Sequence, residues 1–218
     1  MTEIVLYGVP VSCFVAKVRI VLEVKGLRYR EAPPPDGYGS LAYRALVPAG
    51  SVPALLVDGA PLHDSNSILE FLEEIAPDPA LLPIDPLDRG YVRSLLGFHD
   101  TRLEAAARQL FPVVKSDWRK NPESAEPGLA AIRGALERLE QLIDPTPFVM
   151  GPDVSLADLA YPCTLQMAQM LAEEVEQPIK TTDVIGAWVA EVSKIAPVSR
   201  SLEITRAAMD DWLAQFRA

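Results

Sequence analysis

Residues 4–22 read IVLYGVPVSCFVAKVRIVL, and the other elements of the chain are arranged around this stretch. Its first four residues are apolar and include two β-branched side chains, which is typical of a buried strand. After a turn containing glycine and proline, Phe14, Val18 and Val21 recur at helical spacing. The pattern therefore predicts a strand that passes through a turn into a helix beginning just after Ser12.

Ser12 and Cys13 place a hydroxyl and a thiol at the predicted start of this helix. Serine is a favoured N-cap residue, and the amides of the first helical turn carry partial positive charge. Such a position can hold or activate an anion, for example a thiolate. The alternative is that Ser12 only caps the helix and Cys13 is a small core residue, and the stretch alone leaves both interpretations open.

The composition of the 218-residue chain is that of a globular protein with an acidic surface. Hydrophobic residues make up 49% of the chain, enough for a core in one large domain or two small ones. The net charge of −10 argues against binding to nucleic acid or anionic lipid, because both favour basic surfaces. No apolar run reaches the roughly 18–20 residues of a membrane span. We therefore expect neither a nucleic-acid partner nor a membrane partner.

Cysteine and histidine are both scarce in this sequence. Cys13 and Cys163 are too few for a disulfide framework and have no metal-ligand spacing. His63 and His99 are the only histidines, which excludes a site with several histidine ligands. The N-terminus lacks the charged start, apolar stretch and cleavage site of a signal peptide. These features predict a cytoplasmic protein without a bound metal.

The first 76 residues alternate between strand patterns and helix patterns. A second strand is expected within residues 26–31, and a proline-rich loop separates it from a short helix at 40–46. Residues 51–63 carry an Asp-Gly turn between two apolar runs, which predicts a hairpin. A helix with a broad apolar face then starts at Asp64. The predicted order is βαβα followed by ββα.

Four prolines within ten residues divide the chain between positions 77 and 86. We predict an N-terminal domain at residues 1–78, an ordered linker at 79–87 and an all-helical domain at 88–218. Five segments with helical periodicity are expected to form the second domain: residues 89–111, 127–143, 156–175, 182–195 and 199–216.

One of these helices has a complete N-terminal signal. Ser155 is followed three residues later by Asp158, the spacing of a capping box. Val154 and Leu159 fall at the two positions of a hydrophobic staple. Such a box stabilises a helix by about 1 kcal/mol, so we assign both polar residues a structural role.

Four segments, in this order, resemble motifs of the cytosolic glutathione transferases. Residues 12–22 (SCFVAKVRIVL) look like the signature S-P-F-x-x-[RK]-V-R-I-x-L of the tau-like branch, which is serine-type. Residues 47–55 (VPAGSVPAL) are similar to N-P-x-G-x-V-P-x-L, and residues 64–69 (DSNSIL) match [ED]-S-x-x-I-L. The capping box at Ser155 matches the family's box in its second domain. The chain therefore resembles a bacterial-style, serine-type (tau- or zeta-like) member over its whole length.

The resemblance implies an α/β plus all-α fold. A thioredoxin-like βαβ-ββα domain binds glutathione, and the all-helical C-terminal domain forms the hydrophobic substrate site. The family's homodimer, in which the first domain of one chain meets the helices of the other, is expected as well.

The matching motifs imply a glutathione-binding site at five residues besides the catalytic Ser12. In the family the serine hydroxyl donates a hydrogen bond to the glutathione sulfur and favours its thiolate. The Val52–Pro53 peptide is expected to be cis and to present the backbone of Val52 to the cysteinyl part. Asp64 and Ser65 would receive the γ-glutamyl ammonium and carboxylate, or they are simply a helix cap.

Three departures from the motifs affect the expected chemistry. Cys13 replaces the usual proline, which places a second sulfur near the ligand thiol and makes it a secondary catalytic candidate. Val47 replaces an asparagine. Ser51 stands where related enzymes often carry lysine or glutamine for the glycyl carboxylate, which weakens the expected hold on glutathione.

The second substrate is expected between the Ser12 turn and the first helix of the helical domain. Six residues are predicted to line this hydrophobic site: Phe14, Tyr38, Phe98, Arg102, Leu103 and Ala106. Leu110, Phe111 and Trp118 are further candidates, although ordinary core packing is an alternative for each of them. His99 is interpreted as a surface histidine rather than a general base.

Three functions are compatible with these observations. The leading hypothesis is a glutathione transferase that adds the glutathione thiolate to a small apolar electrophile, with glutathione as co-substrate and no metal. A glutathione-dependent isomerase, dehalogenase or thiol transferase using Cys13 is the second. The third is a non-catalytic member of the fold that binds apolar ligands, which the substitutions at Val47 and Ser51 would suit.

Overall fold

The N-terminal domain is built on a four-stranded mixed sheet, as the computed structural model shows for residues 3–217 of the chain. The strands are β1 (Ile4–Tyr7), β2 (Arg30–Ala32), β3 (Ala54–Val57) and β4 (Ala60–His63). Their order in the sheet is β2-β1-β3-β4, with β2 parallel to β1 and the other two pairs antiparallel. The predicted order of elements and the predicted hairpin are confirmed.

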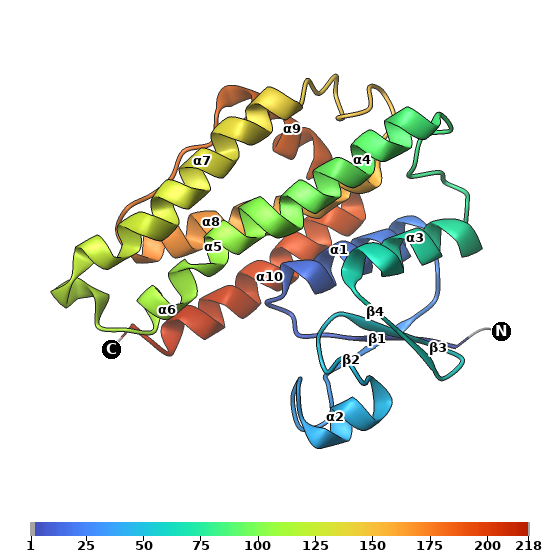
Figure 1. Cartoon of the computed structure of the whole chain (residues 1–218), viewed down its shortest axis with the longest axis horizontal. Helices are drawn as coiled ribbons and strands as arrows, with labels where there is room; N and C mark the ends of the chain where they lie inside the picture. The colour runs from blue at the N-terminus through green and yellow to red at the C-terminus, as the bar shows by residue number, and fades with distance from the viewer. Residues whose placement is uncertain (1–2, 218) are drawn as a thin grey trace.

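Three helices cover the two faces of this sheet (Figure 1). Helices α1 (Cys13–Val24) and α3 (Ser65–Ile75) lie side by side on one face, and the short α2 (Leu41–Leu46) lies beyond the other. Leu6 and Leu55 are paired neighbours in the sheet and are fully buried in the main core. Alternate strand residues point the other way, so Tyr7 meets Tyr43 of α2 with ring centroids 5.6 Å apart.

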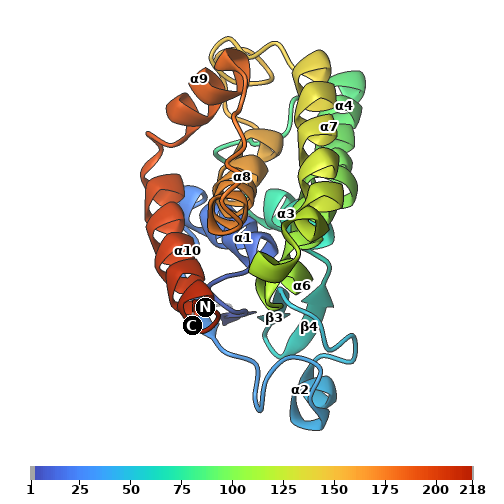
Figure 2. The same cartoon turned by 90° about the vertical axis from the view of Figure 1, so that its left-hand side faces the viewer.

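The remaining residues form a helical domain around the long helix α8 (Figure 2). It contains α4 (Pro86–Phe98), η1 (His99–Glu104), α5 (Ala105–Arg108), α6 (Leu110–Val114), η2 (Trp118–Lys120), η3 (Pro122–Ala125), α7 (Glu126–Leu142), α8 (Leu156–Glu174), α9 (Asp183–Val192) and α10 (Ala196–Ala214). Helix α8 is buried along nearly its whole length, because α1 and α10 pack against it together with α4, α6 and α9.

The predicted continuous helix at 89–111 is wrong in one respect that matters for the site. Its middle, η1, is a π-helix, in which hydrogen bonds span five residues instead of four. Each residue of an α-helix turns the chain by about 100°, so one extra residue in a turn rotates all later side chains by about that angle. Apolar spacing cannot reveal such a turn, because the pattern looks helical on both sides.

Smaller differences concern element ends. The second strand covers residues 30–32 rather than 26–31, and α10 begins at Ala196 rather than at residue 199. Its Pro197 lies in the first turn, where the missing amide hydrogen costs no hydrogen bond.

The capping box of α8 is confirmed and has more partners than the sequence indicates. The carboxylate of Asp158 accepts the backbone amide of Ser155 at 2.8 Å and that of Val149 at 3.0 Å. It also accepts the indole N–H of Trp188, on α9, at 2.7 Å. Asp158 is fully buried, so this one carboxylate ties α8, α9 and the preceding loop together.

Candidate active site

A pocket of about 270 Å³ lies where the sheet, α3 and the helical domain meet. Its walls contain all five predicted glutathione-binding residues: Ser51, Val52, Pro53, Asp64 and Ser65. Phe14 also lines the pocket, as does Asp100 of η1, which the sequence did not indicate. The start of α1, the loop before β3, the start of α3 and η1 of the second domain thus meet at one pocket.

The loop before β3 is held in place by local contacts. The Val52–Pro53 peptide is cis, as expected. The hydroxyl of the buried Tyr43 donates a hydrogen bond to the carbonyl of Ser51 at 2.9 Å, which fixes the loop against α2. The loop therefore presents the short Ser51 side chain and the backbone of Val52 to the pocket.

Asp64 and Ser65 begin α3 at the opposite wall. Asp64 caps the helix, since its Oδ1 accepts the amides of Asn66 at 3.1 Å and Ser67 at 3.2 Å. It adopts a positive φ of 70°, which is unusual for a residue other than glycine. Ser65 follows in the first turn and faces the pocket. A helix N-terminus with a hydroxyl and a carboxylate beside it can receive both a carboxylate and an ammonium group.

Ser12 is the N-cap of α1, as predicted, and is half-buried. Its Oγ accepts the amide of Val15 at a long 3.4 Å. Within residues 3–217 the hydroxyl proton itself has no acceptor, so it remains available to a ligand. Ser12 does not line the 270 Å³ pocket, but Phe14, two residues further, does. Its role as thiolate donor stays a prediction.

Cys13 does not point toward a ligand thiol, which corrects the expectation of a second sulfur there. Its side chain is 2% exposed, and Sγ lies 3.4 Å from the carbonyl of Cys163 and 3.5 Å from the sulfur of Met167 on α8. Burial raises the pKa of the Cys13 thiol, with Cys163 adding to the effect, so the thiol stays protonated. In this structure Cys13 is a core residue.

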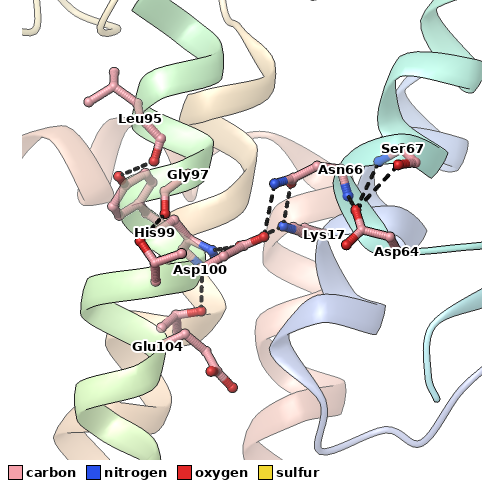
Figure 3. Close-up of polar contacts among 12 residues, drawn as sticks. Lys17, Asp64, Asn66, Ser67, Leu95, Gly97, His99, Asp100 and Glu104 are labelled. Atoms are coloured by element: carbon pink, nitrogen blue, oxygen red, sulfur yellow. Dashed lines mark hydrogen bonds and ion pairs between the residues drawn. The ribbon is translucent and has the colours of Figure 1, made fainter.

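A network of buried and half-buried polar side chains connects the two domains beside the pocket (Figure 3). The ammonium of Lys17, on α1, donates to Asn66 at 2.7 Å and to Asp100 at 2.8 Å. Asn66 Nδ2 donates to the other carboxylate oxygen of Asp100 at 2.9 Å. His99 continues the chain, with Nδ1 2.6 Å from Asp100 and Nε2 2.7 Å from the hydroxyl of Thr164. Sequence reasoning missed this network, because its members come from four separate elements.

His99 is therefore not a surface residue as predicted, but fully buried. Desolvation lowers its pKa, although the hydrogen bond to Asp100 opposes that shift, so the imidazole is neutral and its Nδ1–H donates to Asp100. Desolvation tends to raise the pKa of Asp100, but its contacts with His99 and Lys17 outweigh this and lower it. Desolvation lowers the pKa of Lys17, and Asp100 opposes that shift. Asp100 is thus an ionised carboxylate in the pocket wall, and Lys17 and His99 stabilise its negative charge.

The predicted hydrophobic substrate residues are not brought together. Arg102 and Ala106 line a separate groove of about 300 Å³ against α7, and Leu103 is fully buried in the core. Tyr38 is 65% exposed, and Phe98 packs beside the core without lining the pocket. Phe14 remains at the pocket. The π-helical turn explains the positions of Arg102, Leu103 and Ala106, because it rotates the residues within and after it relative to an unbroken α-helix.

The further apolar candidates are also structural. Leu110 and Trp118 are buried in the core, and Phe111 packs on Trp212 of α10 with ring centroids 4.8 Å apart. In place of Arg102, the rotated helix brings Arg108 to the site, with its guanidinium carbon 5.8 Å from the centre of the Phe14 ring.

Two negative findings concern the described part of the chain. Among residues 3–217, no three histidine, cysteine or acidic side chains come together as a metal site would require. The helices in that same range include none that is long and apolar enough to cross a membrane.

A four-stranded thioredoxin-like sheet, a helical second domain and a pocket at a cis-proline loop together define a class of two-domain proteins. Comparison with known families agrees with this class. The model of the glutathione S-transferase N-terminal domain matches residues 6–80, and that of the C-terminal domain matches residues 102–192.

Individual relatives match most of the chain. A glutathione S-transferase from Pseudomonas putida is 29% identical over 172 residues, covering 78% of this chain and 77% of that protein. A maleylacetoacetate isomerase from Rattus norvegicus is 33% identical over 164 residues, covering 71% of this chain and 73% of its own. The chain therefore belongs to the glutathione S-transferase family.

A solved structure shows the same fold. It is a glutathione transferase family member from Pseudomonas fluorescens with two glutathione molecules bound, with a TM-score of 0.78 and 21% identity over 92% of each chain. The fold class that the sequence predicts is confirmed.

Proposed function

We propose that this protein is a serine-type glutathione transferase, which adds the thiol of glutathione to a small apolar electrophile. The observation that carries the proposal is the pocket itself, where the loop at Val52 and the helix start at Asp64 and Ser65 face Asp100. Membership of the family supports it.

The donors and acceptors of the pocket fit the tripeptide. The γ-glutamyl carboxylate is assigned to Ser65 and the amides of α3, and the γ-glutamyl ammonium to Asp64 and Asp100. The backbone of Val52 is assigned to the cysteinyl part, as strand-like pairing. Ser51 offers the glycyl carboxylate only a hydroxyl, so we expect modest affinity for glutathione.

The chemistry assigned to Ser12 is stabilisation of the thiolate. Its unused hydroxyl proton would donate to the sulfur, and a shift of one pKa unit corresponds to about 1.36 kcal/mol, within reach of one charge-assisted hydrogen bond. The burial of Cys13 favours this serine-type mechanism over thiol transfer through Cys13.

A second candidate is glutathione-dependent isomerisation. The similarity to a relative named maleylacetoacetate isomerase favours it, because 33% identity extends over most of both chains. Both reactions need the same bound thiolate, so a titration of glutathione that follows the pKa of its thiol tests both. A carrier function without catalysis is the remaining alternative.

We further propose a cytoplasmic homodimer with domains at residues 1–78 and 88–218, joined by the linker at 79–87. We assign the dimer contact to the groove of Arg102 and Ala106, which η1 and α5 form with α7, because the alanine and glycine residues in its lining allow close approach of a partner chain. Light scattering during size-exclusion chromatography tests it: a monomeric mass would rule the dimer out.

The deciding experiment is a titration of glutathione into wild type, Ser12→Ala and Cys13→Ala by calorimetry, with thiolate absorbance followed against pH. Thr182→Ala is the matched control, since Thr182 caps α9 by accepting an amide at the same distance of 3.4 Å. We expect Ser12→Ala alone to bind glutathione without lowering the pKa of its thiol. The serine-type assignment would be contradicted if wild type did not bind glutathione, or if the lowering of the thiol pKa were lost in Cys13→Ala.

A further inference from the structure

Arg108 brings a cation from the helical domain to the edge of the candidate site. Its guanidinium carbon lies 5.8 Å from the centre of the Phe14 ring, and Phe14 lines the pocket that also contains Ser65 and Asp100. The hydrogen bonds to Glu104 are the main cause of a raised pKa of Arg108. Cys13 and Tyr38 also lie close enough to raise that pKa slightly. Arg108 therefore lies beside Phe14, in the first turn of α1.

Glu104 holds this guanidinium in one orientation. Nε of Arg108 donates to both carboxylate oxygens of Glu104, at 3.0 and 3.2 Å, and Nη2 donates to Oε1 as well. The Glu104 side chain is 5% exposed, whereas that of Arg108 is 60% exposed. A buried carboxylate is costly unless it is paired, so the pair fixes the arginine firmly on its helix.

The third nitrogen of Arg108 is left free by this arrangement. Within residues 3–217, Nη1 has no hydrogen-bond partner, and its two N–H groups remain available. The other cation near Phe14 is Lys17, 5.2 Å from the ring centre, but it is buried and bonded to Asn66 and Asp100. The Lys17 side chain is 1% exposed and that of Arg108 is 60% exposed, so of these two cations Arg108 is the one that a ligand can reach.

We propose that Arg108 is a specificity-determining residue that binds a carboxylate on the electrophilic substrate, whose planar apolar part lies against Phe14. The inference rests on the proposed transferase function and narrows its second substrate to aromatic or unsaturated carboxylic acids. Pre-orientation by Glu104 reduces the entropy lost on binding, and a guanidinium suits a planar carboxylate better than an ammonium does.

A pair of probes that differ only in charge tests the inference. 4-Chloro-3,5-dinitrobenzoate carries a carboxylate, and 4-chloro-3,5-dinitrobenzamide is its neutral counterpart. In either reaction the glutathione thiol loses its proton to solvent, sulfur bonds to the ring carbon, and chloride leaves with its electron pair. We expect wild type to have a KM for the benzoate about tenfold lower than for the amide.

Arg108→Gln should raise the KM for the benzoate about tenfold and change that for the amide less than about twofold. Arg133→Gln is the control, because Arg133 is a partly exposed arginine of α7 paired with Glu126, away from the pocket. Equal KM values for the two probes in wild type, or equal effects of Arg108→Gln on both, would overturn the inference.

A binding measurement separates this inference from the proposed reaction. The unreactive 3,5-dinitrobenzoate and 3,5-dinitrobenzamide are titrated by calorimetry into wild type and Arg108→Gln. A preference for the benzoate that disappears in the variant supports Arg108 as the anion-binding residue even if no conjugation occurs, and then only the transferase proposal fails. Unselective binding overturns the inference whatever the activity.

Discussion

The ammonium of Lys17 lies 2.8 Å from the carboxylate of Asp100, and this ion pair joins the first helix of one domain to the π-helical turn of the other. Lys17 is 1% exposed, so its charge is balanced almost entirely by this carboxylate and the amide oxygen of Asn66. This ion pair between the domains therefore also positions Asp100 in the wall of the candidate glutathione pocket.

Removing the carboxylate from this pair should destabilise the fold. Asp100→Asn leaves the buried Lys17 ammonium without a counter-charge, and breaking a buried pair in this way costs about 3–5 kcal/mol. Because the Asp100 side chain is 20% exposed, we expect the lower part of that range. Urea denaturation measures the change, and Asp117→Asn, in an exposed pair with Lys120, should change stability little. Equal effects of the two variants would contradict a structural role for the network.

The neutral state of His99 predicts that stability falls in mild acid. Its pKa is lowered in the folded protein, mainly by desolvation, whereas the unfolded chain binds a proton near pH 6.5. Below that pH the unfolded state holds the extra proton, so the free energy of unfolding falls as pH decreases, by at most about 1.4 kcal/mol per pH unit.

Urea denaturation at pH 7.5 and 5.5 tests this pH dependence. His99→Gln should be less stable than wild type at pH 7.5 but lose less stability between the two pH values. His63→Gln, at the exposed end of β4, should behave like wild type. An unchanged pH dependence in His99→Gln would assign the acid sensitivity to other groups.

The burial of Cys13 predicts that it is chemically silent in the folded protein. Neither Cys13 nor Cys163 should react with a thiol reagent at pH 8, and both should react after unfolding, because burial raises both pKa values, that of Cys163 to about 11. Cys13→Ser should keep conjugation within about twofold of wild type. Rapid labelling of Cys13 in the native state, or loss of activity in Cys13→Ser, would restore the thiol-transfer hypothesis.

The carboxylate of Asp158 predicts a large loss of stability on its removal. Asp158→Ala leaves the indole of Trp188 and the amides of Ser155 and Val149 without their acceptor in the core, so we expect a loss of about 3–5 kcal/mol. Asp153→Ala, at an exposed position of the same loop, is the control. A loss near 1 kcal/mol in Asp158→Ala would mean that it acts as an ordinary cap only.

Local signals in the sequence predict most of the fold and the glutathione-binding side of the candidate site, but not the substrate wall. The hairpin around Asp58-Gly59, the caps at Ser12 and Asp64 and the box at Ser155 each depend on neighbours within a few residues, so their patterns are readable. The loop at Val52 and the start of α3 were placed together by their motifs.

The rest of the site depends on contacts between distant segments. Lys17 and Asp100 are 83 positions apart, and His99 and Thr164 are 65 positions apart. A histidine with an adjacent aspartate inside an apolar helix pattern was the only available signal for the network. The substrate wall was predicted from ideal α-helical spacing, which fails after His99 because the helix there is not α-helical.

The π-helical turn between α4 and α5 also separates two tasks that an unbroken helix would link. His99 and Asp100 lie at its start, directly after α4, whereas Arg108 lies after it, at the end of α5. Deleting a single residue within η1 would restore α-helical hydrogen bonding and rotate the side chains of α5 about the helix axis by about 100°. A one-codon deletion could thus exchange the side chain presented to Phe14 while the helix before it keeps its place, so substrate preference could change in one evolutionary step.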